Sequence, residues 1–484
     1  MTPFTSKRRA SRAGILAVCA SFALLPLRPA RAAVPGITGT SFSLVASADY
    51  TTQPDGAAIY SWGYGCDPAT TPAFAPFPGT CPQMQLPGPT LIVTEGQLVT
   101  VTLRNGLPPA AGNTSIVFPG FQVTTTGGVA GLLTQEAASG GGTVTYSFTA
   151  TSPGTHAYHS GTQADLQIEM GLFGAIVVLP ASPPAGCVKG RFSLAAAAFD
   201  NAATCYDREY MFQLSEMDSR IHDAALAQVQ ACPVGPCPAI VAVTEPYHPN
   251  YFLLNGRSMP DDMDTSYAPG YAHQPYNANP HMHPGEKILM RIVGQGRWQH
   301  PFHFHGNHAR VLARDGNLLV SAIDQVSLAG PLLFTTPTVS GQTQDQIFTW
   351  TGKGLNWDVY NHHAGDGSTC TPDAAGYHSV PTDPNYGEWC ADHLKPIPVA
   401  PPDPTIVAIG QWYGGTPYLG IQSTGAFTGT NEPPGTLNQN PQAGYAYMWH
   451  SHNEREITTN DVFPGGIMSM LLIDPPSWFI DETL

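Results

Sequence analysis

The stretch GQLVTVTLRNGLP, from Gly96 to Pro108, indicates the fold class of this chain. Its apolar residues Val99, Val101 and Leu103 alternate with polar ones. This alternation is the period of a β-strand that has one buried and one exposed face. The stretch therefore predicts a short, half-buried β-strand.

Similar short runs recur between turns along the whole 484 residues. Gly (50) and Pro (47) make up about a fifth of the chain, and charged residues only 11%. The main helix expected covers residues 223–231. Many short strands between turn signals are typical of β-sandwiches, so we expect an all-β fold of Greek-key sandwiches with loop insertions. Further strands are predicted at residues 143–150, 174–180, 287–293, 346–352 and 468–474.

The N-terminal residues 1–32 have the three parts of a cleaved signal peptide. A basic start that includes Arg8 and Arg9 precedes an apolar run, and Ala30-Arg31-Ala32 forms a small-x-small cleavage site. We therefore expect a periplasmic or secreted protein. The adjacent arginines Arg8 and Arg9 suggest export by the twin-arginine route.

The rest of the chain is too long for one ordinary core, so two or three domains are expected. We favour two, because the stretch from Pro180 to His300 is short for a complete middle domain. Pro, Ser and Gly gather at residues 179–187 and mark the boundary between them. The predicted units are a first sandwich at residues 33–182 and a second at 183–484. The second carries a long loop insertion at about residues 352–402.

The charge of the chain argues against some partners. The formal net charge is −15, and without the signal peptide the remaining 14 basic and 35 acidic residues give −21. An acidic surface of this kind repels nucleic acid and anionic membranes. No later stretch is apolar for long enough to span a bilayer. We therefore expect neither a nucleic-acid partner nor a membrane span.

Eight cysteines follow the signal peptide, and none has a metal-ligand spacing to a histidine. An even number of cysteines in an oxidising compartment predicts disulfides. The spacing alone leaves 105 connectivities open. Our hypothesis is sequence-local pairing, namely Cys66–Cys81, Cys187–Cys205, Cys232–Cys237 and Cys370–Cys390.

Two H-x-H motifs are the main candidates for a metal site. His303 and His305 lie on one predicted strand, and His450 and His452 lie on another. Alternate residues of a strand share a face, so neighbouring strands would bring all four imidazoles together. Neutral imidazole binds Cu, Zn, Ni or Fe. The simpler alternative is that each histidine is hydrogen-bonded in the core. His300 and Ser451 would face the opposite side, which predicts two sites back to back.

Four stretches resemble the multicopper oxidases, which are laccase-like proteins of cupredoxin domains. They cover most of both predicted sandwiches, and the third and fourth are the most specific. The resemblance implies tandem cupredoxin-like domains and copper as cofactor. The stretches are QLPGPTLIVTEGQLVTVTLRNGLP (85–108), GTHAYHSGTQADLQIEMGLFGAIVV (154–178), HPFHFHGNHARVLARDG (300–316) and MWHSHNERE (448–456).

The chain departs from the family where electrons enter. The resemblance assigns the blue copper to His300, to a cysteine at position 451 and to a histidine at position 456. Here these last two positions hold Ser451 and Glu456. A neutral hydroxyl does not replace a soft thiolate as a copper ligand. We therefore expect no blue copper. We expect Glu454 and Glu456 to be surface residues in salt bridges, and the alternative is that one of them is an acid or base near the site.

The three-copper cluster of the family is also reduced. Val117, Pro119 and Gly161 stand where the family has ligands. The resemblance then implies one or two non-blue copper ions in place of a full four-copper set. The surviving cluster ligands are His159, His303, His305, His450 and His452.

Two functions remain open from the sequence. The first is an exported copper protein with residual oxidoreductase activity. The alternative is a metal-poor pseudo-oxidase that acts as a structural or protein-interaction module. A third hypothesis is another metal, such as zinc or manganese, at the same histidines. Two-domain relatives form trimers with the cluster between subunits, so a homo-oligomer would be needed to bring His159 to the other ligands.

Overall fold

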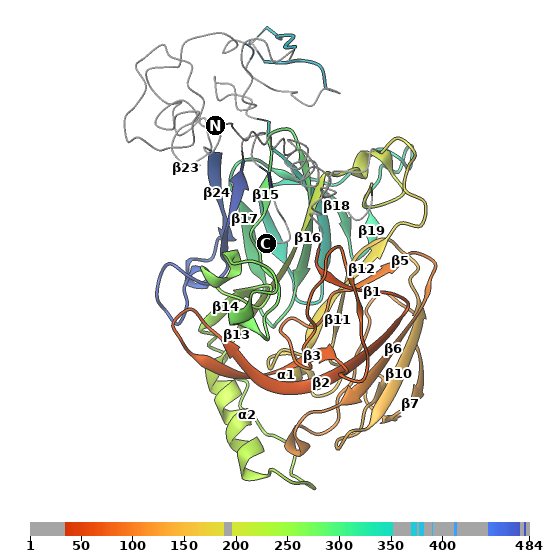
Figure 1. The fold of residues 1–484 in the computed structure, drawn as a ribbon, viewed down its shortest axis with the longest axis vertical. Coiled ribbons are helices and arrows are strands. Elements are labelled where there is room, and N and C mark those ends of the chain that lie inside the picture. The colour runs from red at the N-terminus through yellow and green to blue at the C-terminus, as the bar shows by residue number, and fades with distance from the viewer. Residues whose placement is uncertain are drawn as a thin grey trace, which may run out of the picture.

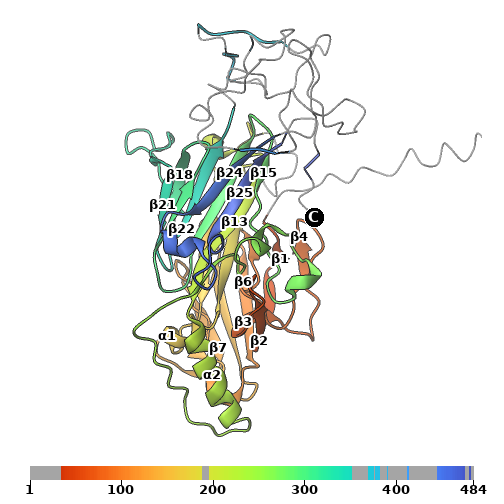
Figure 2. The same ribbon diagram turned by 90° about the vertical axis from the view of Figure 1, so that its left-hand side faces the viewer.

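The computed structural model describes two β-sandwiches and the segments that join them (Figures 1 and 2). The predicted signal peptide lies outside the described residues, and so does most of the predicted insertion at 352–402. The described residues are 34–187, 196–351, 369–374, 377–381, 390, 411–413, 444–474 and 479–480.

The first sandwich consists of two five-stranded sheets. One has the strand order β11 (Gly154–His159), β12 (Phe173–Leu179), β5 (Leu91–Thr94), β1 (Gly36–Thr38) and β4 (Ala73–Ala75). The other has the order β3 (Ala58–Cys66), β2 (Ser41–Thr52), β6 (Leu98–Asn105), β10 (Thr143–Thr149) and β7 (Thr124–Gly127). A two-stranded ribbon is formed by β8 (Val129–Ala130) and β9 (Gln135–Glu136).

The second sandwich has a seven-stranded and a six-stranded sheet. The larger sheet contains β14 (Tyr251–Leu254), β13 (Arg208–Met217), β16 (Lys287–Gly294), β22 (Thr343–Thr349), β18 (Ala309–Arg314), β19 (Asn317–Leu318) and β20 (Leu332–Leu333). The smaller sheet contains β15 (His281–Met282), β25 (Met468–Ile473), β24 (Gly444–Ser451), β17 (His300–Phe304), β21 (Thr335–Thr338) and β23 (Gln411–Tyr413).

The all-β prediction is confirmed, and so are the predicted strands. The strand expected from the opening stretch is β6, where Val99, Val101 and Leu103 are buried and the residues between them are half-exposed. The other five correspond to β10, β12, β16, β22 and β25. The predicted helix is the C-terminal part of α2 (Ser219–Ala231), which begins after the capping side chain of Asp218.

Aromatic and aliphatic side chains fill both sandwiches. Trp62, Tyr64 and Tyr146 are fully buried in the first core, while Trp449 and Tyr447 are fully buried in the second. Helix α2 packs on the first sandwich against β3 (Figure 2). The two largest clusters of buried hydrophobic side chains thus lie one in each sandwich.

The two sandwiches are joined through β11 and β22. The backbone N–H of Thr155 donates to Asp345 Oδ2 at 3.0 Å, and its hydroxyl donates to Asp345 Oδ1 at 2.6 Å. Asp345 also pairs with the guanidinium of Arg291, which in turn pairs with Glu209. All four side chains are buried. A buried and charge-paired network therefore crosses from the first sandwich to the second.

Local disulfide pairing is also confirmed. The four bonds are Cys66–Cys81, Cys187–Cys205, Cys232–Cys237 and Cys370–Cys390. Among the described residues, no helix is both long and apolar enough to cross a membrane.

Candidate metal centre

The two H-x-H motifs come together because their strands pair. Strands β17 and β24 are antiparallel neighbours, and His303 lies directly opposite His450. His305 follows the end of β17, and its backbone N–H donates to the carbonyl of Met448 on β24. The register therefore brings side chains about 150 residues apart in sequence to one face of the sheet.

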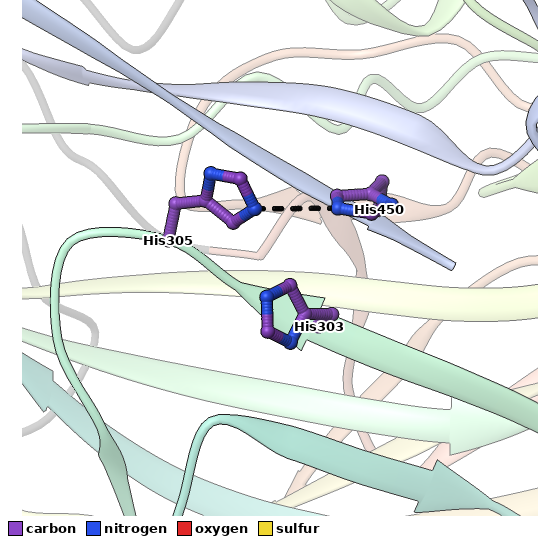
Figure 3. Close-up of side chains that lie close together, drawn as sticks. All are labelled: His303, His305 and His450. Carbon is purple, nitrogen blue, oxygen red and sulfur yellow. Dashed lines mark hydrogen bonds between the residues drawn. The ribbon is translucent and has the colours of Figure 1, made fainter. Parts of the chain in front are cut away.

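Three imidazoles are close enough to share one ion. The nitrogens of His303, His305 and His450 that could act as ligands all lie within 4.8 Å of one another (Figure 3). The Nε2 atoms of His305 and His450 face each other at 3.4 Å. Two nitrogens that bind one ion at about 2.0–2.1 Å in tetrahedral geometry lie about 3.3 Å apart. The observed separation is that of a hydrogen bond between the two rings, and it also fits two ligands of one metal ion.

Partial burial lowers the pKa of two of these imidazoles, His303 and His450. Desolvation, and next the neighbouring histidine rings, lower the pKa of His303 to about 4. Desolvation also lowers the pKa of His450. A neutral imidazole retains a lone pair on one ring nitrogen, and only that form binds a metal. At neutral pH His303 and His450 are therefore in the neutral form that can act as a ligand.

Hydrogen bonds to the other ring nitrogens set the orientation of two of the rings. His450 Nδ1 lies 2.7 Å from the carbonyl oxygen of Ser451, so this nitrogen carries the proton and Nε2 carries the lone pair. His303 Nδ1 lies 2.7 Å from the hydroxyl of Thr335 on β21. Such outer hydrogen bonds are the usual way in which a metal-binding histidine is held in position.

His452 lies at the edge of the cluster. Its ring centroid is 4.9 Å from that of His303 and 5.7 Å from that of His450. Its side chain is 54% exposed and has Glu454 at 3.6 Å. The predicted four-histidine group therefore consists of three converging rings and one solvent-exposed ring beside them.

His159 does not belong to this group. It ends β11 in the first sandwich and forms a bridge with Val117. Its Nδ1 lies 3.0 Å from the carbonyl oxygen of Ser160, and burial lowers its pKa. Within the described residues, the group of donors that could share an ion with His303 does not include His159. Among the residues that the structure describes, the converging histidines all belong to the second sandwich.

His300 lies on the other face of the sheet, as the strand period predicts. Its Nδ1 is 2.9 Å from Glu456 Oε2, and its Nε2 is 2.9 Å from Glu216 Oε2. All three side chains are fully buried. The prediction that Glu456 is a surface residue was wrong, because the chain turns inward after β24 and directs this carboxylate at His300. Glu454 is exposed as predicted.

The sequence reasoning missed Glu216 as a partner of His300. Glu216 lies near the end of β13, a strand in which every residue is buried. A carboxylate inside a fully buried strand needs a positive or hydrogen-bonding partner. The run YMFQLSEM, residues 210–217, therefore contained a signal, but only the tertiary structure shows which partner it has.

Comparison with known families agrees with this architecture. The sequence profile of one multicopper oxidase domain matches residues 80–183, and that of a second multicopper oxidase domain matches residues 244–336. The first match contains β11 and His159, and the second contains β17 with His303 and His305. No curated protein matches the chain.

Several solved structures are similar to this chain. The multicopper oxidase mgLAC is 16% identical, with a TM-score of 0.46, over 93% of this chain and 89% of that one. The blue copper oxidase of Nitrosomonas europaea is 16% identical, with a TM-score of 0.45, over 91% and 85%. The copper nitrite reductase of the same organism is 18% identical, with a TM-score of 0.42, over 66% and 86%.

The family assignment thus rests on the two profile matches. They fall on the two sandwiches, one on each. The described strands are those of an all-β protein, as such domains require. The chain thus contains two stretches, one in each sandwich, that match multicopper oxidase domains.

Proposed function

We propose that this protein is an exported, non-blue copper protein of the multicopper oxidase family. Copper would be held by His303, His305 and His450, with His452 at the edge of the site. Neutral imidazole is a good ligand for copper, and no sulfur donor is close to these rings among the described residues. Copper bound by imidazoles alone supplies one-electron redox chemistry without the thiolate bond that makes a blue site.

One observation carries this proposal. The cross-strand pair His303–His450 and the 3.4 Å approach of His305 Nε2 to His450 Nε2 form a ligand set without any rearrangement of the sheet. Histidines that merely fill a core are usually hydrogen-bonded one at a time. Three converging imidazole rings are the arrangement expected for a metal site.

We propose that the histidine cluster binds one or two copper ions per chain. Three converging nitrogens suffice for one ion, and the exposed ring of His452 beside them would allow a second. His159 would add a further ligand only if a second copy of the chain brought it close. The residual oxidoreductase activity of the protein would then depend on assembly.

We also propose the assembly itself, a trimer in which each first sandwich faces the histidine cluster of a neighbouring copy. Leu132 and Leu133 are 91% and 64% exposed, and Leu133 lies next to Gly161, two residues after His159. On the second sandwich, Phe334 is 54% exposed with its ring 5.8 Å from that of His303. Exposed apolar side chains beside both halves of the predicted ligand set favour a contact there.

Light scattering of the purified protein tests the assembly. Three times the monomer mass is the expected result. The double change Leu132→Asp with Leu133→Asp should give monomers. The control Ile323→Asp, at a side chain that is 96% exposed and far from His159 in sequence, should leave the mass unchanged. A monomeric wild-type protein would end this part of the proposal.

We also propose that the protein is exported and that it consists of two domains, at residues 33–182 and 183–484. Four disulfides fit an oxidising compartment, and the N-terminal 32 residues have the pattern of a signal peptide. N-terminal sequencing of the protein after expression with its leader should give Ala33 as the first residue. A retained leader in a soluble cytoplasmic fraction would contradict the export.

Metal analysis tests the copper site. After copper loading and dialysis, the wild-type protein should retain one or two ions per chain, with an electron paramagnetic resonance signal of non-blue type. His303→Ala and His450→Ala should each remove at least one ion. The matched control is His308→Ala, since His308 belongs to the same motif but packs on Phe334, outside the cluster. Equal copper in all four proteins would overturn the site.

The pseudo-oxidase remains the second candidate because of one observation. Val117, Pro119 and Gly161 replace family ligands in the first sandwich, so a three-copper cluster has too few ligands there. Wild-type protein without retained copper, but with unchanged folding, would support an interaction module in place of an enzyme. Retention of zinc or manganese in preference to copper would support the third hypothesis.

A further inference from the structure

The residues that the family uses for its blue copper form a closed hydrogen-bonded group in this protein. His300 has one carboxylate on each ring nitrogen, Glu456 at Nδ1 and Glu216 at Nε2, both at 2.9 Å. The hydroxyl of Ser451 donates to Glu456 Oε2, and Asn453 Nδ2 donates to Glu456 Oε1 at 2.8 Å. Both oxygens of Glu456 are thus used.

Glu216 is held as completely as Glu456. Its Oε1 accepts the backbone N–H of Arg297 at 2.6 Å and that of Trp298 at 2.9 Å. The hydroxyl of Tyr247 donates to the same oxygen at 3.2 Å. Its Oε2 accepts from His300. Four donors thus surround this one buried carboxylate and satisfy both of its oxygens.

This group does not fit a copper ion. The two carboxylates lie on opposite sides of the His300 ring, so their oxygens do not converge on one point with either ring nitrogen. Ser451 replaces the thiolate, and its hydroxyl proton is already directed to Glu456. A metal would have to break bonds that satisfy fully buried groups, which is costly.

Both carboxylates can accept a hydrogen bond from the ring only if the ring is protonated. A neutral ring between two buried carboxylates could donate to just one of them and would leave the other facing a lone pair. Desolvation lowers the pKa of His300, but hydrogen bonds and charges from Glu216 and Glu456 outweigh it and raise the pKa to about 9. The geometry and the charges therefore agree.

We propose that this site holds a proton in place of a metal: His300 is a buried imidazolium clamped between Glu216 and Glu456. The positive charge that the family obtains from copper is then supplied by the ring itself. We call these three residues the histidinium clamp. It excludes copper and zinc from the position and is independent of whether the cluster on the other face binds a metal.

The histidinium clamp also connects the histidine-bearing strand to the first sandwich. Tyr247 lies between Glu216 and Glu169, and its hydroxyl is 2.7 Å from Glu169 Oε2. Glu169 belongs to the segment between β11 and β12 and is buried. A continuous buried chain thus runs from Glu456, directly after β24, to the first sandwich. The clamp therefore fastens β24 where the family has a copper ion.

Nuclear magnetic resonance of the full chain tests the protonation directly. In protein labelled with ¹⁵N-histidine at about pH 8, an ordinary histidine with a pKa of about 6.5 is almost entirely neutral. His300 should instead show two ring N–H signals, identified by their absence in His300→Gln. A single ring N–H signal would overturn the proposal.

A carboxylate variant and its control test whether the clamp, and not any loss of a nearby negative charge, holds the second proton on His300. Glu456→Gln should lower the pH at which the His300 ring loses its second proton. The matched control Glu454→Gln, two residues away and 81% exposed, should leave that pH unchanged. An unchanged titration in folded Glu456→Gln would also overturn the proposal.

Metal content gives a second measurement that does not depend on the carboxylate variants. The double variant His303→Ala with His450→Ala removes the cluster on the other face. Adding His300→Gln to this double variant should leave the number of retained copper or zinc ions per chain unchanged. A loss of one ion per chain on adding His300→Gln would show that the site binds metal and would overturn the clamp.

Discussion

Glu169 makes the stability of this protein sensitive to pH. Its side chain is buried between the backbone N–H of Asp218 and the hydroxyl of Tyr247, with Glu216 beyond. Burial, and also the charge of Glu216, raise the pKa of Glu169 to about 8. The variant Glu169→Gln keeps the shape and hydrogen-bonding capacity of the protonated acid but removes its titration.

The size of the effect follows from proton linkage. The folded pKa of about 8 lies above the ordinary value of 4.5, so between these limits the folded chain holds a proton that the unfolded chain has released. The stabilisation of the folded state by this bound proton is fully present below pH 4.5 and is lost as the pH rises through 8. One proton changes the free energy of unfolding by about 1.4 kcal/mol per pH unit. For a domain of this size, that shifts the unfolding midpoint by about 3–5 °C per pH unit.

Thermal unfolding followed by circular dichroism at several pH values tests this reasoning. Near pH 5 the wild-type protein and Glu169→Gln should have similar midpoints. Towards pH 8 the variant should become progressively more stable than the wild type. Glu454→Gln, at an exposed carboxylate, should follow the wild-type curve. Parallel curves for the wild type and Glu169→Gln would refute the assignment of a protonated Glu169.

Three further changes test the packing. Asp345→Ala leaves Thr155 without its acceptor and Arg291 with one carboxylate fewer, so chemical denaturation should show a loss of about 3–5 kcal/mol. Replacing both Cys66 and Cys81 by serine opens a bridge across 15 residues, which should lower the free energy of unfolding by about 3 kcal/mol in the same assay. Trp449→Ala removes a fully buried ring and should lower it by about 3–5 kcal/mol, whereas an unchanged transition midpoint would show that the second core is not packed as described.

The strands could be predicted because their pattern is local. Alternation of apolar and polar residues is visible wherever one face of a strand is buried, as at Val99, Val101 and Leu103 of β6. The disulfides could be predicted as neighbours because each pair spans a short loop, at most 20 residues in sequence. Both features depend on residues that are close together along the chain, so the sequence was enough to predict them.

The histidine cluster could be predicted only in part. The i, i+2 spacing within each H-x-H motif is local and indicates a shared face. That His303 faces His450 depends on the register of β17 against β24, which joins residues 147 positions apart. The motif resemblance supplied this pairing. The predicted partners of His159 lie in the other sandwich, and no local sequence pattern sets the distance between His159 and these partners.

The sequence by itself determined that the chain is all-β, that two pairs of histidines share strand faces and that no thiolate stands at position 451. Each of these depends on residue type or on spacing along one strand. Only the tertiary structure decided that Glu216 and Glu456 enclose His300. Glu216, His300 and Glu456 come from three separate segments. A buried charge needs a partner close to it, and which group is close depends on how the whole chain packs and desolvates it.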